Sequence, residues 1–570
     1  MTIKDYYQEE LSSLRELAAE FSRAYPALAP MLAGQGDDPD VERLLEGVAF
    51  LSGLNRQRFE AGFPELIQSL LRLLFPQAIR PVPSFTLVKF QLNLGFGEAI
   101  HVPQGTLLDS IPVEGAVARF ATERDLKILP AQVTKVKVQD AAGGARVTVE
   151  ITFSSNLAKW VGDKISFFWG GDYPEASMRR GLFFQKVKEI RAGAPGREIR
   201  LREGAMRSAA WTEETGDLSE SDLLASLSLL EDYFALPQKF LFTEIGDLKR
   251  AALEADRVLS LVFLFGDLRA KLPPLRPEHF LLNVVPAANV FPHPAIPINV
   301  DHRRAEYLLR PQGQESGKIA IFAVNSVHSV TREGKIRPYV PFETLPTRKE
   351  GEGAYSLSWR TSPVSGQSEH YLRVLYVPGE KPARETLSVS LLCHNQKIVD
   401  SLRTGEIVRP TDSSPAMATF GNIIPPTRLI PPAEDQGSLW LFFSRLHLSV
   451  AKIFTSRALK ELLETHSFAR DGDPGRRVAN IKRVEAIASV KVEKEDYLTR
   501  GRPIRGSRVI LEVDKSGFAS FGDLLLFGDA LSHYLGLFHQ INTFARLVMV
   551  EKSSREVIEW NPRLGTRRLV

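Results

Sequence analysis

The chain has 570 residues, of which 44% are hydrophobic and 25% charged, a composition typical of a folded globular protein rather than a disordered one. Its 72 basic and 68 acidic residues leave a net charge of +4 with no long basic run, which argues against nucleic-acid binding. A single cysteine excludes an internal disulfide, and no apolar run is long enough to span a membrane. We therefore expect a cytoplasmic protein of several domains, with neither a secretory signal nor direct membrane insertion.

Residues 1–83 predict a helical segment. Apolar residues recur at steps of three and four over 3–24, which indicates a first amphipathic helix. Asp38-Pro39 is typical of a helix start, so we expect a second helix there and a third that begins at Pro64. The apolar stripes face either their own core or a partner subunit, because an obligate interface resembles a domain core cut in half. The candidate interface residues on these stripes are Leu44, Leu45, Val48, Leu66, Leu70 and Leu74.

The middle of the chain predicts strands. The segment 146–153 alternates strictly between apolar and polar residues, which predicts a strand with one buried face, and AAGGA before it is consistent with a hairpin. We assign 84–250 to a first β-rich domain with a helical insertion, and 251–421 to a second β-rich domain. We expect Cys393 to be a buried, unreactive thiol in a strand. The other expected elements are a helix at 219–236 and strands at 84–93, 133–139, 257–265, 318–326, 370–377 and 385–393.

Two proline pairs in 422–437 exclude a helix or a central strand there, so we interpret this stretch as an extended connector. Beyond it, 438–570 predicts a mixed α/β domain. The expected elements are helices at 439–449, 456–465 and 521–539, and strands at 508–514 and 544–551. The predicted fold class is therefore α+β and multidomain, with an N-terminal helical segment, a β-rich middle and a mixed α/β C-terminal domain.

The sequence contains no recognisable catalytic arrangement. No two of the eleven histidines have the helical spacing of a metal site, and neither a phosphate-binding GxxxxGK[ST] nor a GxSxG nucleophile motif occurs. We therefore predict no catalytic, cofactor-binding or metal-binding residue, no cofactor and no enzymatic activity.

One polar cluster, at 301–307, is a candidate site of another kind. Its simpler interpretation is a charged turn where a strand begins. The alternative is a structural hub, in which arginine forks fix the orientation of neighbouring domains. The hub candidates are Asp301, Arg303, Arg304 and Tyr307.

Several blocks, in this order along the whole chain, resemble the TssF family of type VI secretion baseplate subunits. The most recognisable of them is DPDVERLLEGVAFLSGLNRQRFEAGFPELIQSLLRLLFPQAIRPVPS at 38–84. The others are YYQEELSSLRELAAEFSRAYPALAPML, HVPQGTLL, LLEDYFALPQKFLFTEIGDL, NVVPAANVFPHPAIPINVDHRRAEYLLRP, GSLWLFFSRLHLSV, INTFARLVM and WNPRLGTRRLV.

The resemblance implies a non-enzymatic structural subunit. In the family, two copies join one TssG to form a wedge that carries TssK and TssE, and six wedges surround the VgrG spike and seed the contractile tail. The assembled baseplate docks on the inner-membrane complex. The N-terminal helices enter a helical core shared with TssG, which matches the apolar stripes. A baseplate wedge protein of a contractile phage or phage-like injection particle is the alternative expectation.

Overall fold

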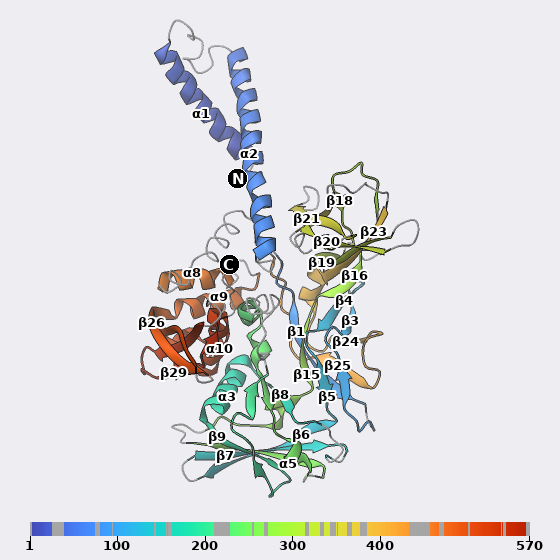
Figure 1. The fold of residues 1–570 in the computed structure, drawn as a ribbon, viewed down its shortest axis with the longest axis vertical. Helices are drawn as coiled ribbons and strands as arrows, with labels where there is room; N and C mark the ends of the chain where they lie inside the picture. The colour runs from blue at the N-terminus through green and yellow to red at the C-terminus, as the bar shows by residue number, and fades with distance from the viewer. Residues whose placement is uncertain are drawn as a thin grey trace. The chain divides into compact units, whose positions relative to one another are not determined.

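The computed structural model describes residues 3–565 apart from 26–38, 75–79, 94, 142–143, 156, 158–161, 210–228, 254–255, 267–271, 314–317, 331–335, 343–348, 350, 362–367, 377–384, 432–455, 467–471, 500–501, 537–538 and 540–542. The chain divides into two compact units (Figure 1). The first contains the N-terminal helices, and the second begins at Arg80 and contains all the described strands.

The first unit is a pair of long helices, α1 (Ile3–Ala24) and α2 (Pro39–Leu74). The bounds predicted for α1 are confirmed. The prediction that Pro64 begins a separate helix is wrong, because α2 is one helix of 36 residues that continues through it. Proline removes one amide donor, but the residues on both sides are mostly good helix formers and keep the helix continuous. Asp38 of the predicted helix start lies outside the described residues.

The second unit begins with a six-stranded sheet in the order β24-β3-β4-β15-β1-β25. Its two edge strands meet, because the amide of Gly405 donates to the Asn422 carbonyl over 2.9 Å and that of Ile407 donates to the Asn422 side chain over 3.0 Å. The strands are β1 (Phe85–Leu92), β3 (Leu107–Val113), β4 (Ala116–Thr122), β15 (Val284–Ala288), β24 (Ile407–Pro410) and β25 (Ala418–Asn422). A separate ribbon pairs β2 (Ile100–Val102) with β5 (Leu126–Ile128).

Two further sheets follow along the chain. In the five-stranded one, β6 and β7 form the predicted hairpin, and β7 alternates between buried and half-buried residues along its whole length. Its strands are β6 (Ala131–Ala141), β7 (Gly144–Phe153), β9 (Val187–Gly193), β10 (Ile199–Arg200) and β13 (Val258–Phe265). The four-stranded sheet contains β8 (Ile165–Trp169), β11 (Met206–Ser208), β12 (Phe242–Ile245) and β14 (Phe280–Leu282).

Helix α3 (Tyr173–Lys186) packs on these two sheets and was not predicted from the sequence. Its Phe183 is fully buried, with its ring 4.7 Å from Trp169 of β8 and 5.0 Å from Phe263 of β13. Of the predicted helix at 219–236, only 229–236 lies within the described residues, and 229–235 is helical. The short helix α5 (Lys249–Leu253) follows β12.

An eight-stranded sheet is built from a continuous stretch of chain between β15 and β24. Cys393 is buried in its strand β23, and burial raises the pKa of its thiol to about 12, which confirms the prediction for this residue. The strands are β16 (Phe291–Pro294), β17 (Ile298–Val300), β18 (Tyr307–Leu308), β19 (Ile319–Val330), β20 (Ile336–Pro341), β21 (Gly353–Thr361), β22 (Ser368–Leu375) and β23 (Glu385–Asn395).

The C-terminal part combines a sheet with helices, as predicted, although its described helix Pro474–Glu485 was not predicted from the sequence. Strands β27 and β28 are parallel, and the buried helix α10 connects them in a βαβ arrangement. The elements are α8 (Ser456–His466), α9 (Pro474–Glu485), α10 (Phe521–Gly536), β26 (Ile487–Thr499), β27 (Arg502–Val513), β28 (Thr543–Glu551), β29 (Val557–Glu559) and β30 (Arg563–Leu564).

The predicted α+β class with its three regions is confirmed. The predicted helix at 439–449 lies outside the described residues. The domain boundaries at 83, 250, 421 and 437 stay predictions.

Candidate assembly surface

The seam between the two N-terminal helices includes ion pairs and a close approach of the two backbones. Arg15 pairs with Glu42 at 2.9 Å, and Arg56 of α2 reaches Glu10 of α1 at 3.0 Å. Gly53 lets the backbones approach closely, because a Cβ there would lie 3.1 Å from the amide nitrogen of Tyr7. Of the described apolar side chains of this pair, Tyr6 is buried and Leu14 and Leu45 are half-buried, but others are not covered.

Those other apolar side chains are exposed. Leu44, Val48 and Leu51 recur at helical spacing along α2, and 69%, 46% and 60% of their surfaces are accessible. Leu17 and Phe21 of α1 are also exposed. We call Leu44, Val48 and Leu51 the α2 stripe. Scattered exposed apolar residues are ordinary on proteins, but a periodic row on a helix indicates a surface that another helix covers.

The sequence-predicted interface residues differ in their exposure, and some of their side chains are not described. Leu44 and Val48 belong to the α2 stripe, whereas Leu45 is half-buried. Leu66, Leu70 and Leu74 lie in the second half of α2, at positions whose side chains are outside the described part of the structure. Their assignment to an interface stays a prediction.

The predicted hub at 301–307 forms a turn stabilised mainly by Asp301. Its carboxylate accepts the amide of Arg303 over 3.1 Å and the hydroxyl of Tyr307 over 3.3 Å, and the Arg303 amide is the largest cause that lowers the pKa of Asp301. Arg303 and Arg304 are exposed, and neither side chain bonds to another described residue. The ion pairs of this segment come instead from Glu306, which binds Arg360 at 2.8 Å and Arg373 at 3.6 Å.

A buried polar group that the sequence did not predict lies in the second unit, which also contains 301–307. Asp523 of α10 is fully buried and pairs with Arg483 of α9 at 3.0 Å. The same carboxylate accepts the hydroxyl of Tyr233 over 2.6 Å and the hydroxyl of Tyr173. We call these four residues the Asp523 junction. It links α3, the 229–235 helix, α9 and α10 through one carboxylate.

Burial and charge act together at the Asp523 junction. Burial raises the pKa of Tyr173 and of Tyr233 well above the ordinary tyrosine value, so both hydroxyls stay protonated and can donate hydrogen bonds. Burial alone works against the charged form of Arg483, but Tyr233 and Asp523 raise its pKa overall. The four groups therefore satisfy one another, which is the arrangement of a rigid structural connection.

The Asp523 junction was missed because its members are far apart in the sequence. One signal pointed toward it: Tyr233 lies in LLEDYFALPQKF, a block that carries the family resemblance. That block is held from several sides, since Asn480 donates to the Phe234 carbonyl over 3.0 Å and Arg476 donates to the Ala235 carbonyl over 3.0 Å.

The described residues offer no arrangement suited to catalysis by a metal. They contain no group of three metal-ligating side chains and no helix long and apolar enough to cross a membrane. One cavity, of about 550 Å³, is lined by the start of α3 and the residues that precede α10. Its two arginines are paired with glutamates, Arg179 with Glu175 at 2.5 Å and Arg276 with Glu278 at 3.3 Å, so each arginine that lines the cavity has a counter-ion.

Comparison with known proteins decides the family. The family model described as "Type VI secretion system, TssF" matches residues 1–567. The chain belongs to the TssF family. It is 27% identical to the type VI secretion system component TssF1 of Pseudomonas aeruginosa, over 99% of this chain and 98% of that protein. Because the match runs almost from end to end, TssF-family membership applies to the helical pair and to the β-rich unit alike.

Solved structures agree with this assignment. The chain matches, with a TM-score of 0.76 and 25% identity, a chain of the type VI TssK-TssF-TssG baseplate subcomplex, over 92% of this chain and 99% of that one. A chain of the type VI baseplate complex shares the fold, with a TM-score of 0.64 and 22% identity over the full length of both chains. This TssF-family chain is therefore a baseplate component of a type VI secretion system, and its relatives are structural components.

Proposed function

We propose that this chain is a non-enzymatic wedge subunit of the baseplate and that the α2 stripe joins it to a partner helix. The observation that carries the proposal is the exposure of Leu44, Val48 and Leu51, which recur at helical spacing along α2. Covering such a stripe removes apolar surface from water at about 25 cal/mol per Å², which favours assembly. Leu45, Leu66, Leu70 and Leu74 are further candidates for this interface.

TssG and TssK are the first expected partners, because the similar solved structure is a TssK-TssF-TssG subcomplex. We further propose two copies of this chain per TssG, contacts with TssE and the VgrG spike, and six wedges in which neighbouring copies meet. The chain would work in the cytoplasm and dock with the baseplate at the inner-membrane complex. The phage alternative has less support, because the family model that matches almost the whole chain is that of the type VI secretion system rather than of a phage.

The proposed interface is tested by co-expressing the chain with its TssG and TssK neighbours and measuring the mass of the purified complex. Leu44→Asp places a charge in the α2 stripe and should lower the yield of the complex about tenfold or more. Asn55→Asp adds the same charge at an exposed polar position of α2 and should leave the yield unchanged. Leu70→Asp extends the test to the second half of the helix.

Two outcomes would contradict these proposals separately. If Leu44→Asp and Val48→Asp both co-purify like the wild type, the α2 stripe is not the interface. A wild-type chain that stays alone with every partner overturns the wedge function itself.

We also propose that the segment 301–307 orients the eight-stranded sheet as a structural hub. Its support is the turn that Asp301 closes through Arg303 and Tyr307. Replacing Arg304 with Ala should then lower the melting temperature or block assembly. A variant that matches the wild type in both measurements removes Arg304 from the hub.

A further inference from the structure

The eight-stranded sheet is an insertion within the six-stranded one. The chain leaves the six-stranded sheet at the end of β15, Ala288, and enters β16 at Phe291. It returns after Asn395, the last residue of β23, and reaches β24 at Ile407. We call 291–395 the inserted module. It has an apolar core of its own, which includes Phe291, Tyr307, Tyr355, Leu372 and Leu391.

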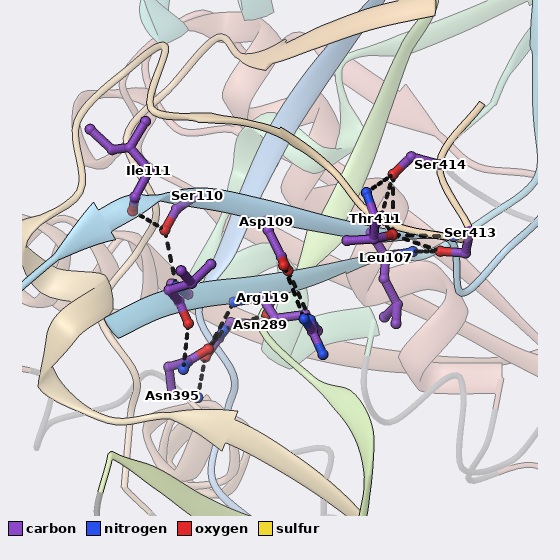
Figure 2. Close-up of polar contacts among 12 residues, drawn as sticks. Leu107, Asp109, Ser110, Ile111, Arg119, Asn289, Asn395, Thr411, Ser413 and Ser414 are labelled. Carbon is purple, nitrogen blue, oxygen red and sulfur yellow. Dashed lines mark hydrogen bonds and ion pairs between the residues drawn. The ribbon is translucent and has the colours of Figure 1, made fainter. Parts of the chain in front are cut away.

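Two asparagines stand at the two chain crossings and bind each other. The Asn289 side-chain amide donates to Asn395 Oδ1 over 2.8 Å, and the backbone amide of Asn395 donates to Asn289 Oδ1 over 2.8 Å. They are 106 positions apart in sequence, yet both are buried, with 0% and 2% of their surfaces exposed. We call this pair the asparagine clasp (Figure 2).

The asparagine clasp is also bonded to the six-stranded sheet, at β4. Asn289 donates to the Arg119 carbonyl over 2.7 Å, and Asn395 Oδ1 accepts the Arg119 amide over 2.9 Å. Asn395 further donates to the Val117 carbonyl over 3.3 Å. Figure 2 shows both asparagines converging on Arg119, whose guanidinium forms a two-bond pair with Asp109 at 2.8 and 3.0 Å.

Because hydrogen bonds are directional, those of the asparagine clasp fix the orientation of the inserted module as well as its contact with the six-stranded sheet. Each amide bond needs its donor and acceptor aligned, so a rotation of the inserted module would break several of them at once. A broken bond would leave buried polar groups of Asn289, Asn395 and Arg119 unpaired, which is unfavourable because they can no longer bond to water either. Apolar contacts, by comparison, are non-directional.

Among the described residues, one further polar contact between the inserted module and the six-stranded sheet lies at the surface. Lys318 at the module's edge donates to the carbonyls of Glu114 and Gly115 over 3.2 and 3.1 Å, and these bonds are exposed. Exposed bonds exchange readily with water and contribute little rigidity. The buried asparagine clasp is thus the directional contact of this boundary.

We infer that the asparagine clasp is an orientation lock: it fixes the angle of the inserted module on the six-stranded sheet, and its loss frees the module to pivot about the two crossings. Hinge motions of this kind are absorbed by a few residues at the ends of elements, which is where Asn289 and Asn395 lie. The proposed wedge function does not depend on this inference.

The test measures the distance between spin labels in the full-length chain. Cysteines for labelling replace Val408 of β24 and Ile336 of β20, which are 40% and 70% exposed, while the native Cys393 is buried and does not compete. Asn289→Ala and Asn395→Ala should each make the distance distribution about twice as wide as in the wild type. The matched control Asn325→Ala removes an exposed amide bond to Ser390 inside the module and should not broaden it.

Hydrogen exchange of β19 and β23 separates a lock from a folding contact. The lock predicts unchanged protection of these strands in both clasp variants, together with the broader distance distribution. An unchanged distribution overturns the inference, and so does loss of protection throughout the module. If Asn289→Ala does not accumulate as folded protein, Asn289→Ser can replace it, because serine keeps one donor. This variant should give a distance distribution of intermediate width. A distribution as narrow as that of the wild type would also overturn the inference.

Discussion

The N-terminal helix pair and the Asp523 junction arrange the same kinds of residues in opposite ways. Between α1 and α2, charged side chains such as Arg15 and Glu42 lie in the seam, while Leu44 and Leu51 face outward. At the junction, the leucines of α10 are buried and surround a buried carboxylate, Asp523. One region thus leaves apolar surface uncovered, and the other leaves almost none.

The difference teaches where each region obtains its stability. A helix pair with an uncovered apolar stripe gains stability when a partner covers the stripe, since binding to the folded state stabilises that state. The region around Asp523 is complete within the chain, because every charged or polar group of the junction has its partner. We therefore expect mutations at the junction to affect folding and mutations at the α2 stripe to affect assembly.

The largest expected effect is that of Asp523→Ala. The substitution leaves the Arg483 guanidinium, which is 5% exposed, buried without its counter-ion, and it removes the acceptor of two tyrosine hydroxyls. Breaking a buried ion pair from one side typically lowers the free energy of unfolding by about 3–5 kcal/mol. Urea denaturation of the purified chain measures this loss.

A matched pair of variants sharpens the result. Glu461→Ala breaks an exposed ion pair with Arg457 on α8 and should change the free energy of unfolding very little. Replacing Arg483 with Met and Asp523 with Leu together should recover part of the loss, because no unpaired charge then remains. An Asp523→Ala chain as stable as the Glu461→Ala control would show that the junction is not a folding element.

A smaller loss is expected from Gly522→Ala, next to the same carboxylate. A Cβ at this position would lie 1.8 Å from the carbonyl oxygen of Ser177 in α3, so α3 and α10 would have to separate. Forcing extra atoms into a packed contact typically lowers the free energy of unfolding by about 1–3 kcal/mol. The melting temperature should fall accordingly, and an unchanged melting temperature would mean that the two helices are not held this closely.

Much of the fold followed from periodicity in the sequence. The bounds of α1 and the alternation of β7 were predicted because one pattern repeats without interruption. Helix α3 was missed because its buried positions include Ser177, Arg179 and Arg180, so polar residues stand where the helical pattern needs apolar ones. The continuation of α2 through Pro64 was missed because proline more often ends or begins a helix than lies inside it.

The candidate sites were less predictable than the fold. Leu44 and Val48 were expected on an apolar stripe, but whether a stripe is covered depends on the other helix, which periodicity does not report. The Asp523 junction and the asparagine clasp join residues that are up to 350 and 106 positions apart, and no local rule connects such pairs. The structure was therefore needed to show that the α2 stripe is exposed and that the polar groups of the Asp523 junction are paired.

The smallest effects are expected for substitutions at two glycines of α2, within the N-terminal helix pair. Gly47 has open space around its Cα, so Gly47→Ala should stabilise the isolated helix pair by about 0.5–1 kcal/mol. Gly53→Ala places a methyl group 3.1 Å from the Tyr7 amide nitrogen, so the same change of residue should weaken the pair. Hydrogen exchange of the α2 amides measures both effects locally, with slower exchange expected for the first variant and faster exchange for the second.

Since Gly47 lies between Leu44 and Leu51, a partner that packs closely on the α2 stripe would meet the added methyl group. A Gly47→Ala chain that exchanges more slowly when alone but binds TssG more weakly would place the partner on this face, whereas faster exchange in the free chain would contradict the open surface described for Gly47.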